Sequence, residues 1–267
     1  MRRRGAVSTC ALLRGSCSGL VRRVQPPCLC PPLTAALCGS PRRSGFREAS
    51  PGIFQGRAMR YMIGSDSLPS FLTVQEEIPD AGMLLYPKSW RAPAGVYACD
   101  NGVYGAFQKG KVWDDQMHHA FLGMLNKIPA DNPPLWVLLP DAVADWPRTV
   151  ELAAMYLPLV RQRRLPVAIA LQDGCNFEEV MGFAPDWVFV AGSTEWKEAN
   201  ILTACRFFHA RGIKVHVGRV NTRRRLMLCQ SAGADSADGT TLNKFLNATL
   251  PLIANTLRQP CLIFGQE

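Results

Sequence analysis

Several patterns that mark familiar protein classes are missing from this 267-residue sequence. The five cysteines after residue 58 are scattered and form no C-x-x-C pair, so they indicate neither a zinc knuckle nor a disulfide framework. No apolar run approaches the roughly 20 residues of a membrane helix. No G-x-G-x-x-G follows a first strand and no P-loop motif occurs, so neither kind of nucleotide site is expected. We therefore expect a reduced, cytoplasmic protein with no membrane partner, metal or cofactor.

Acidic residues are almost absent from residues 1–58. This segment carries ten arginines, no lysine and a single acid, Glu48, whereas the rest of the chain has twenty basic and twenty acidic residues. The segment is also rich in Pro, Ser and Cys and weak in apolar periodicity, which predicts a disordered basic tail. It fits a transit peptide, a nucleic-acid-binding arm, or translated upstream sequence with the true start at Met59 or Met62. We favour the last, because globular patterning begins at Met59.

From residue 59 to residue 267, short apolar runs alternate with amphipathic segments. The strand candidates are residues 82–86, 95–99, 135–139, 166–171, 187–190, 214–217 and, more weakly, 261–264. The helix candidates are residues 114–127, 146–164, 198–211 and about 223–231. Pro158 predicts a kink or an early end in the second of these helices. Because this alternation is typical of parallel βα units, the sequence predicts a compact (β/α)8 barrel of the TIM type over residues 59–267, with a doubly wound sheet as the alternative.

Polar residues and glycines follow almost every predicted strand. In a βα barrel, these positions at the carboxyl ends of the strands form the active site. They are rich in carboxylates, amides and glycines, without a cluster of metal ligands and without a Ser-His pair. This composition suits a flat polar ligand, with carboxylate chemistry at its centre. The segments concerned are residues 100–102, 140–145, 172–174, 191–193, 216–219 and 235–238.

Residues 233–240 place two carboxylates, Asp235 and Asp238, three residues apart among small side chains. Small residues allow a backbone to approach a ligand closely, and a carboxylate at a strand end can attack a carbon or hold a proton. A surface turn is the alternative, because Asp-Gly is a common turn pair. The stretch follows a basic loop whose arginines either contact phosphates or form a solvated helix face. These arginines are Arg219, Arg223, Arg224 and Arg225.

Taken in order, these segments resemble the motifs of the tRNA-guanine transglycosylase family. The resemblance covers roughly residues 98–240 and is strongest to the shorter phage and bacterial homologues that place 7-deazaguanines in DNA. The family's tRNA enzymes carry a C-x-C-x2-C…H zinc site after the nucleophile, whereas this chain has only Cys261 and no histidine beyond Asp238. The chain is also shorter than those enzymes. Both departures favour DNA, or another purine-bearing substrate, over tRNA.

The resemblance implies base exchange on a nucleotide that is flipped out of the duplex or single-stranded. Asp238 would be the nucleophile that attacks C1′ and forms a covalent intermediate, as in a retaining glycosidase. Asp100 would protonate the leaving guanine and later take a proton from the incoming 7-deazaguanine. Tyr104 or Phe107 is expected to stack on the purine. The residues implied in substrate binding are Asp141 or Asp145, Gln172, Gly174, Gly192 and Asp235.

Simpler structural interpretations stand beside these assignments. The run Asp100-Asn101-Gly102 also fits a tight turn, one of Asp141 and Asp145 is expected to cap the helix at residue 146, and His216 fits a core or rim position. For the whole protein, the main alternative is a catalytically inert barrel that binds nucleic acid or a partner protein. A different barrel enzyme, such as a glycosidase or a lyase, is the third interpretation. The transglycosylase hypothesis also admits a helper ATPase as a further partner.

Overall fold

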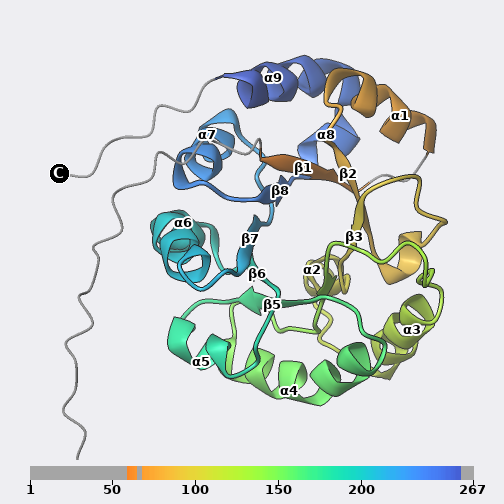
Figure 1. The fold of residues 1–267 in the computed structure, drawn as a ribbon, viewed down its shortest axis with the longest axis vertical. Coiled ribbons are helices and arrows are strands. Elements are labelled where there is room, and N and C mark those ends of the chain that lie inside the picture. Colours follow the sequence, from red (N-terminus) through yellow and green to blue (C-terminus); the bar gives the residue numbers. More distant parts are fainter. Residues whose placement is uncertain (1–58, 65–67, 260–267) are drawn as a thin grey trace, which may run out of the picture. The chain divides into compact units, whose positions relative to one another are not determined.

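The computed structural model describes residues 59–64 and 68–259. Within them, eight parallel strands form a closed barrel in which the strands pair in chain order and β8 pairs with β1. Helices surround this barrel on the outside (Figure 1). The arrangement confirms the predicted (β/α)8 barrel and excludes the doubly wound sheet. The tail predicted for residues 1–58 and the weak strand predicted at 261–264 lie outside the described residues.

The strands and helices of the barrel lie between Arg60 and Arg258. Its strands are β1 (Arg60–Ile63), β2 (Gly82–Leu85), β3 (Tyr97–Cys99), β4 (Val137–Leu138), β5 (Val167–Leu171), β6 (Trp187–Val190), β7 (Lys214–Val217) and β8 (Ser236–Asp238). Its helices are α1 (Leu68–Glu77), α2 (Val103–Phe107), α3 (Asp115–Leu125), α4 (Trp146–Gln162), α5 (Phe177–Met181), α6 (Thr194–His209), α7 (Arg223–Ala232), α8 (Thr241–Lys244) and α9 (Leu246–Arg258), with the 3-10 turn η1 (Pro87–Ser89). Among the described helices, none combines the length and the apolar character needed to cross a membrane.

Side chains alternate between the two faces of each strand, because the strand repeat is two residues. The outward side chains, such as Val215 and Val217 of β7, pack with the helices in the main hydrophobic core. The inward side chains form a smaller core inside the barrel. Its members are Met62, Leu84, Ala98, Trp136, Leu138, Ala168, Ala170, Trp187 and Phe189. The same alternation places Ser236 and Asp238 on one face of β8 and Ala237 on the other.

Strands β1 and β8, which close the barrel, were not predicted as strands. β8 has only three residues and little apolar character, so it carries no strand pattern of its own. It pairs with β7 on one side and with β1 on the other, where Met62 lies opposite Asp238. The surface-turn interpretation of Asp238 and Gly239 is therefore wrong for Asp238. Gly239 is needed for space, because a Cβ there would lie 2.5 Å from the Val220 carbonyl oxygen and 2.6 Å from the Tyr61 hydroxyl.

Helices α3, α4, α6 and α7 each begin at a side chain that satisfies one of their free amide groups. Asp145 caps α4 by accepting a hydrogen bond from the Arg148 N–H at 3.0 Å. Ser193 caps α6 by accepting one from the Trp196 N–H at 3.3 Å, and α6 therefore begins before the predicted start at residue 198. Helix α4 runs through Pro158 to Gln162, so the early end expected at this proline is wrong.

Candidate active site

Three carboxylates lie at one end of the barrel, the mouth, which is formed by the carboxyl ends of the strands. Asp238 is the last residue of β8, Asp100 directly follows β3, and Asp141 lies in the loop after β4. We call these three the mouth carboxylates. Burial raises the pKa of Asp100 from its ordinary 3.8 to about 7, the Gly102 N–H opposes this rise, and the charges of Asp238 and Asp141 add to it. Asp100 therefore lies close enough to the other two carboxylates to be influenced by their charges.

The turn Asp100-Asn101-Gly102 is also part of the site, so its two interpretations do not exclude each other. Asp100 Oδ1 accepts a hydrogen bond from the Gly102 N–H at 2.6 Å, and Gly102 has the positive φ of +78° that suits glycine. The buried Asn101 side chain donates to the Leu139 carbonyl and to Asp141 Oδ1, both at 2.7 Å. Asn101 thus ties the loop after β3 to the loop after β4, a role that its place in the sequence did not indicate.

Asp141 is buried and held from two sides. Asn101 donates to Oδ1, and the Gln172 side-chain amide donates to Oδ2. Burial raises the Asp141 pKa from 3.8 to about 6, against the lowering effect of these hydrogen bonds and of the Arg219 charge. Asp145, by contrast, is exposed and caps α4. Of the two aspartates between which the spacing did not decide, Asp141 lies in the site and Asp145 is the cap.

Gln172 joins three loops at the mouth. Its buried side chain follows β5, donates to Asp141 after β4, and accepts from the Ala144 N–H at 2.9 Å and from the Gly192 N–H at 3.1 Å. The Gly192 amide, expected to contact a purine, is thus bonded to Gln172 in this structure. Gly192 has a φ of +46°, and a Cβ there would lie 2.5 Å from the Trp196 ring, so both conformation and space require glycine. Gly174, with a φ of +80°, completes the turn after β5.

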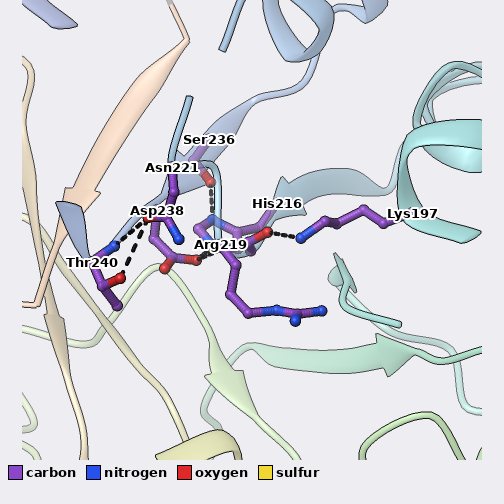
Figure 2. Close-up of polar contacts among 8 residues, drawn as sticks. Lys197, His216, Arg219, Asn221, Ser236, Asp238 and Thr240 are labelled. Atoms are coloured by element: carbon purple, nitrogen blue, oxygen red, sulfur yellow. Dashed lines mark hydrogen bonds and ion pairs between the residues drawn. The ribbon is translucent and has the colours of Figure 1, made fainter. Parts of the chain in front are cut away.

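Asp238 is fixed by a polar chain that runs inside the barrel (Figure 2). His216 Nε2 lies 3.0 Å from Asp238 Oδ1, and His216 Nδ1 lies 2.8 Å from the Ser236 hydroxyl. Since a carboxylate accepts, Nε2 carries the proton, and Nδ1 then accepts from Ser236. The Arg219 backbone N–H also donates to Asp238 Oδ1, at 3.3 Å. His216 is fully buried, as expected for a core histidine, but it also contacts the candidate nucleophile.

Asp235 does not share the site with Asp238. It precedes β8 and therefore lies at the amino end of the barrel, where the Arg60 N–H bonds to its carbonyl. Its carboxylate oxygen Oδ2 lies 2.8 Å from His209 Nε2 and accepts from the Val215 N–H at 2.8 Å. The expectation that Asp235 binds substrate is therefore unsupported by its position. Its contacts instead join α6, β7 and β8 at the amino end of the barrel.

Of the four arginines in the basic segment, Arg219 is the one that lies in the mouth. Its guanidinium lies 4.6 Å from the centre of the Tyr104 ring, and Nη2 donates to the carbonyl oxygens of Ala191, at 3.1 Å, and of Gly192. The Tyr104 ring in turn stacks on the exposed ring of Phe107, with 6.5 Å between centroids. The other three lie on α7. Arg224 and Arg225 pair with Glu198, and Arg223 donates to Gln259 at 3.2 Å.

Lys197 is a buried cation that the sequence did not single out. It lies on α6, and its Nζ donates to the Gly218 carbonyl at 2.5 Å, beside the Asp238 chain (Figure 2). Burial lowers its pKa from 10.5 to about 8, and the Arg219 charge adds to this lowering. The contact holds the loop after β7 in place. That loop carries the Arg219 N–H that bonds to Asp238.

Fold and site together define a (β/α)8 barrel with a carboxylate-lined mouth. No model of a known protein family matches the chain, and no curated protein matches it either. Among solved structures, the 3-hexulose-6-phosphate synthase from Salmonella typhimurium is 12% identical, with a TM-score of 0.49 over 74% of this chain and 98% of that one. A 4-hydroxy-2-oxoglutarate aldolase/2-deydro-3-deoxyphosphogluconate aldolase is 11% identical, with a TM-score of 0.47 over 74% and 90%. The fold assignment rests on the strand pairing and not on these likenesses.

Proposed function

We propose that this protein is a base-exchange transglycosylase. It replaces guanine in a nucleic acid, DNA rather than tRNA, with a 7-deazaguanine derivative. The observation that carries the proposal is the grouping of the mouth carboxylates. A hydrogen bond from His216 fixes the Asp238 carboxylate, and the Asp100 pKa is about 7. A fixed carboxylate beside one that holds a proton at neutral pH is the pair that retaining displacement at a sugar carbon requires.

Asp238 acts as the nucleophile in this proposal. Both described hydrogen bonds of its carboxylate, from His216 and from the Arg219 backbone, go to Oδ1, so Oδ2 is the atom assigned to the attack. Oδ2 forms a bond to C1′ while the bond from C1′ to the guanine nitrogen breaks. The Nε2–H of His216 donates to Oδ1 and fixes the direction of the carboxylate. The product of this step is a glycosyl ester on Asp238 and a free guanine.

Asp100 moves the proton in both halves of the reaction. It gives its proton to the departing purine, and it then receives the ring N–H proton of the incoming 7-deazaguanine, whose nitrogen attacks C1′ and releases Asp238. A pKa of about 7 suits both directions, because a general acid-base group is most effective when its pKa is near the working pH. Asp141, fixed by Asn101 and Gln172, presents the carboxylate that reads the polar edge of the base.

The choice of DNA rests on the sequence beyond Asp238. Residues 239–267 offer one cysteine, Cys261, and no histidine, so these residues do not supply the ligand set of the tRNA enzymes. The base must leave the duplex to reach the mouth, and DNA that is single-stranded or locally opened meets this need at the lowest cost. A helper ATPase that opens the duplex is compatible with this requirement.

The test is label transfer by the full chain. Guanine-containing DNA and, separately, tRNA are incubated with labelled 7-cyano-7-deazaguanine, and Asp238→Ala runs in parallel. We expect label in DNA with the wild type and none with Asp238→Ala. Asp186→Asn is the matched control, because Asp186 lies at the amino end of β6 and bonds to Arg161 and to the Val167 N–H.

Three other outcomes would change the proposal. Label in tRNA alone would overturn the choice of DNA. Binding of DNA without label transfer would favour the inert binding barrel. Transfer that survives Asp238→Ala would remove the assigned nucleophile.

A further inference from the structure

The Arg219 side chain bridges the mouth from one side to the other. Strands β3 and β7 are four places apart in a closed ring of eight, and they lie on opposite sides of the barrel (Figure 1). Arg219 follows β7, and Tyr104 lies on α2, which follows β3. The 4.6 Å contact between guanidinium and ring therefore joins opposite walls of the mouth. The charge of Arg219 also lowers the Asp141 pKa, which places it near that carboxylate.

The guanidinium takes a position that a flat ring with an amino group would also take. It is planar, lies over the aromatic face of Tyr104, and uses one nitrogen to donate to the carbonyls of Ala191 and Gly192. The exocyclic amino group of guanine has the same two N–H donors on a planar, conjugated system. Stacked layers are about 3.5–4 Å apart, so a base between the two groups would need about 7 Å. The observed contact leaves no room for one.

Among the described residues, the Arg219 guanidinium forms no ion pair, although its charge acts on Asp141 from a longer distance. Arg224 and Arg225 each form an ion pair with Glu198, whereas the described partners of the Arg219 guanidinium are two carbonyls and a ring. A half-buried guanidinium held in this way gains from meeting an anion, and phosphate matches its fork of donors. The part of Arg219 that contacts Asp238 is the backbone N–H, which Lys197 supports through the Gly218 carbonyl. The side chain can therefore move while the Asp238 contact remains.

We propose that Arg219 is a specificity-determining residue that selects nucleotides over nucleosides and bases, which lack the phosphate. In this structure its guanidinium occupies the place on Tyr104 that the base would take. An entering guanine nucleotide displaces it, and the released guanidinium pairs with the phosphate of that same nucleotide. A free base must displace the guanidinium without gaining the ion pair to a phosphate. The free base therefore binds weakly until a nucleic acid is present. This inference rests on the proposed function, in which a guanine nucleotide enters the mouth.

Equilibrium binding to the full chain tests the inference without any chemistry. Deoxyguanosine and deoxyguanosine 5′-monophosphate are titrated into wild type, Arg219→Ala and Arg219→Lys by calorimetry. We expect the wild type to bind the monophosphate at least about 10-fold more tightly, because hydrogen bonds to charged groups are the strong ones. In Arg219→Ala the ratio of the two affinities falls toward one. Deoxyguanosine binds to this variant more tightly than to wild type, because no guanidinium covers the Tyr104 ring.

Arg211→Ala is the matched control. Arg211 also lies over a ring, 3.6 Å from the centre of Phe207, but it follows the end of α6 at the other end of the barrel, so both affinities should equal those of wild type. Arg219→Lys keeps the charge without the planar fork, and it should bind deoxyguanosine more tightly than wild type while keeping part of the phosphate preference.

Three results would overturn the inference. The first is deoxyguanosine affinity that is unchanged or weaker in Arg219→Ala. The second is a phosphate preference that survives in Arg219→Ala. The third is no binding of either ligand to any variant, which would remove the base site as well. The ratio changing as expected while label transfer fails would leave the Arg219 inference in place and overturn only the exchange reaction.

Discussion

Asp100 holds a carboxyl group in surroundings that favour its protonated form. Its pKa is raised mainly by burial, from the ordinary 3.8 to about 7. An unfolded chain releases this proton near pH 4, whereas the folded chain keeps it until about pH 7. The folded state therefore loses stability relative to the unfolded state as the pH rises through this window, and the loss is complete above it. A group suited to proton transfer at neutral pH is thus one that destabilises the fold there.

Asp100→Asn is therefore expected to raise Tm at about pH 8 and to leave it nearly unchanged at about pH 4. Asn retains an oxygen that can accept the Gly102 N–H, so the turn is kept. The same variant should lower the rate of base exchange by about 10²–10⁴-fold, the typical contribution of a general acid-base group. Thermal unfolding across this pH range and label transfer measure the two effects. A Tm gain of equal size at both pH values would contradict the raised pKa.

His216 is expected to act on Asp238 by position rather than by contact with the base. His216→Phe removes the donor to Oδ1 and should lower kcat by about 10- to 100-fold with KM little changed, because a hydrogen bond to a charged group contributes about 1.5–3 kcal/mol. His216→Gln, which restores an N–H donor, should recover part of kcat. Steady-state kinetics of both variants measure this. A rise in KM with kcat unchanged, or no recovery with Gln, would count against the assigned role.

At the scale of elements, α6 supports the mouth through a charge that it buries. Lys197 is almost fully buried, and its pKa is lowered to about 8 by burial and by Arg219. Above this value the folded chain releases the proton, while the unfolded chain keeps it up to about pH 10.4. Stability contributed by this group therefore rises with pH through that window. Below it, the charged amine stays buried, and its hydrogen bond to Gly218 offsets part of the cost.

Comparison of wild type with Lys197→Met isolates this effect. The free energy of unfolding of the wild type should increase relative to that of the variant as the pH rises from about 8 to about 10. Denaturant titrations at several pH values measure the difference, since the other titrating groups are common to both chains. A difference that stays constant with pH would show that the lysine has an ordinary pKa.

The predicted strands overlap β2 to β7, whereas the two strands that close the barrel, β1 and β8, were not predicted. Residues 187–190 coincide with β6, which is an apolar run, and residues 214–217 coincide with β7, in which two valines alternate with Lys214 and His216. β8 consists of Ser, Ala and Asp, and its strand conformation is imposed by pairing with β7 and β1. Helix α6 began earlier than its apolar pattern suggested, because Ser193 provides the cap. The local sequence pattern therefore predicts a strand or helix poorly where pairing with another strand, or a capping residue, determines where it begins and ends.

At the scale of the whole molecule, the rule that barrel chemistry lies at the carboxyl ends of the strands located Asp100, Asp141, Gln172 and Asp238. The rule did not find the contacts of Asn101, His216 or Lys197, because these depend on which side chains from different strands and helices meet. It also placed Asp235 with Asp238, although the strand between them carries the two acids to opposite ends of the barrel. The position of a residue in the sequence shows at which end of the barrel it lies only when the limits of the strand are known.

Because β1 closes the barrel, we expect it to be essential for folding. Two shortened chains test this expectation. A chain that begins at Met59 keeps Arg60–Ile63 and should retain the Tm and the activity of the full chain. A chain that begins at Leu68 loses β1 and leaves β2 and β8 with unpaired edges, so it should not fold cooperatively. Circular dichroism and thermal unfolding distinguish these results. Cooperative unfolding of the shorter chain would mean that the barrel tolerates an open edge.

The core inside the barrel contains a tryptophan whose fluorescence can report on the site. Trp136 is fully buried, and its ring centre lies 4.9 Å from that of His216, which bonds to Asp238. Indole emission responds to the charge and motion of a neighbouring imidazole, so a ligand that reacts with Asp238 should change the fluorescence of Trp136. The signal assigned by difference against Trp136→Phe would follow formation and loss of the covalent intermediate in real time, in unlabelled protein.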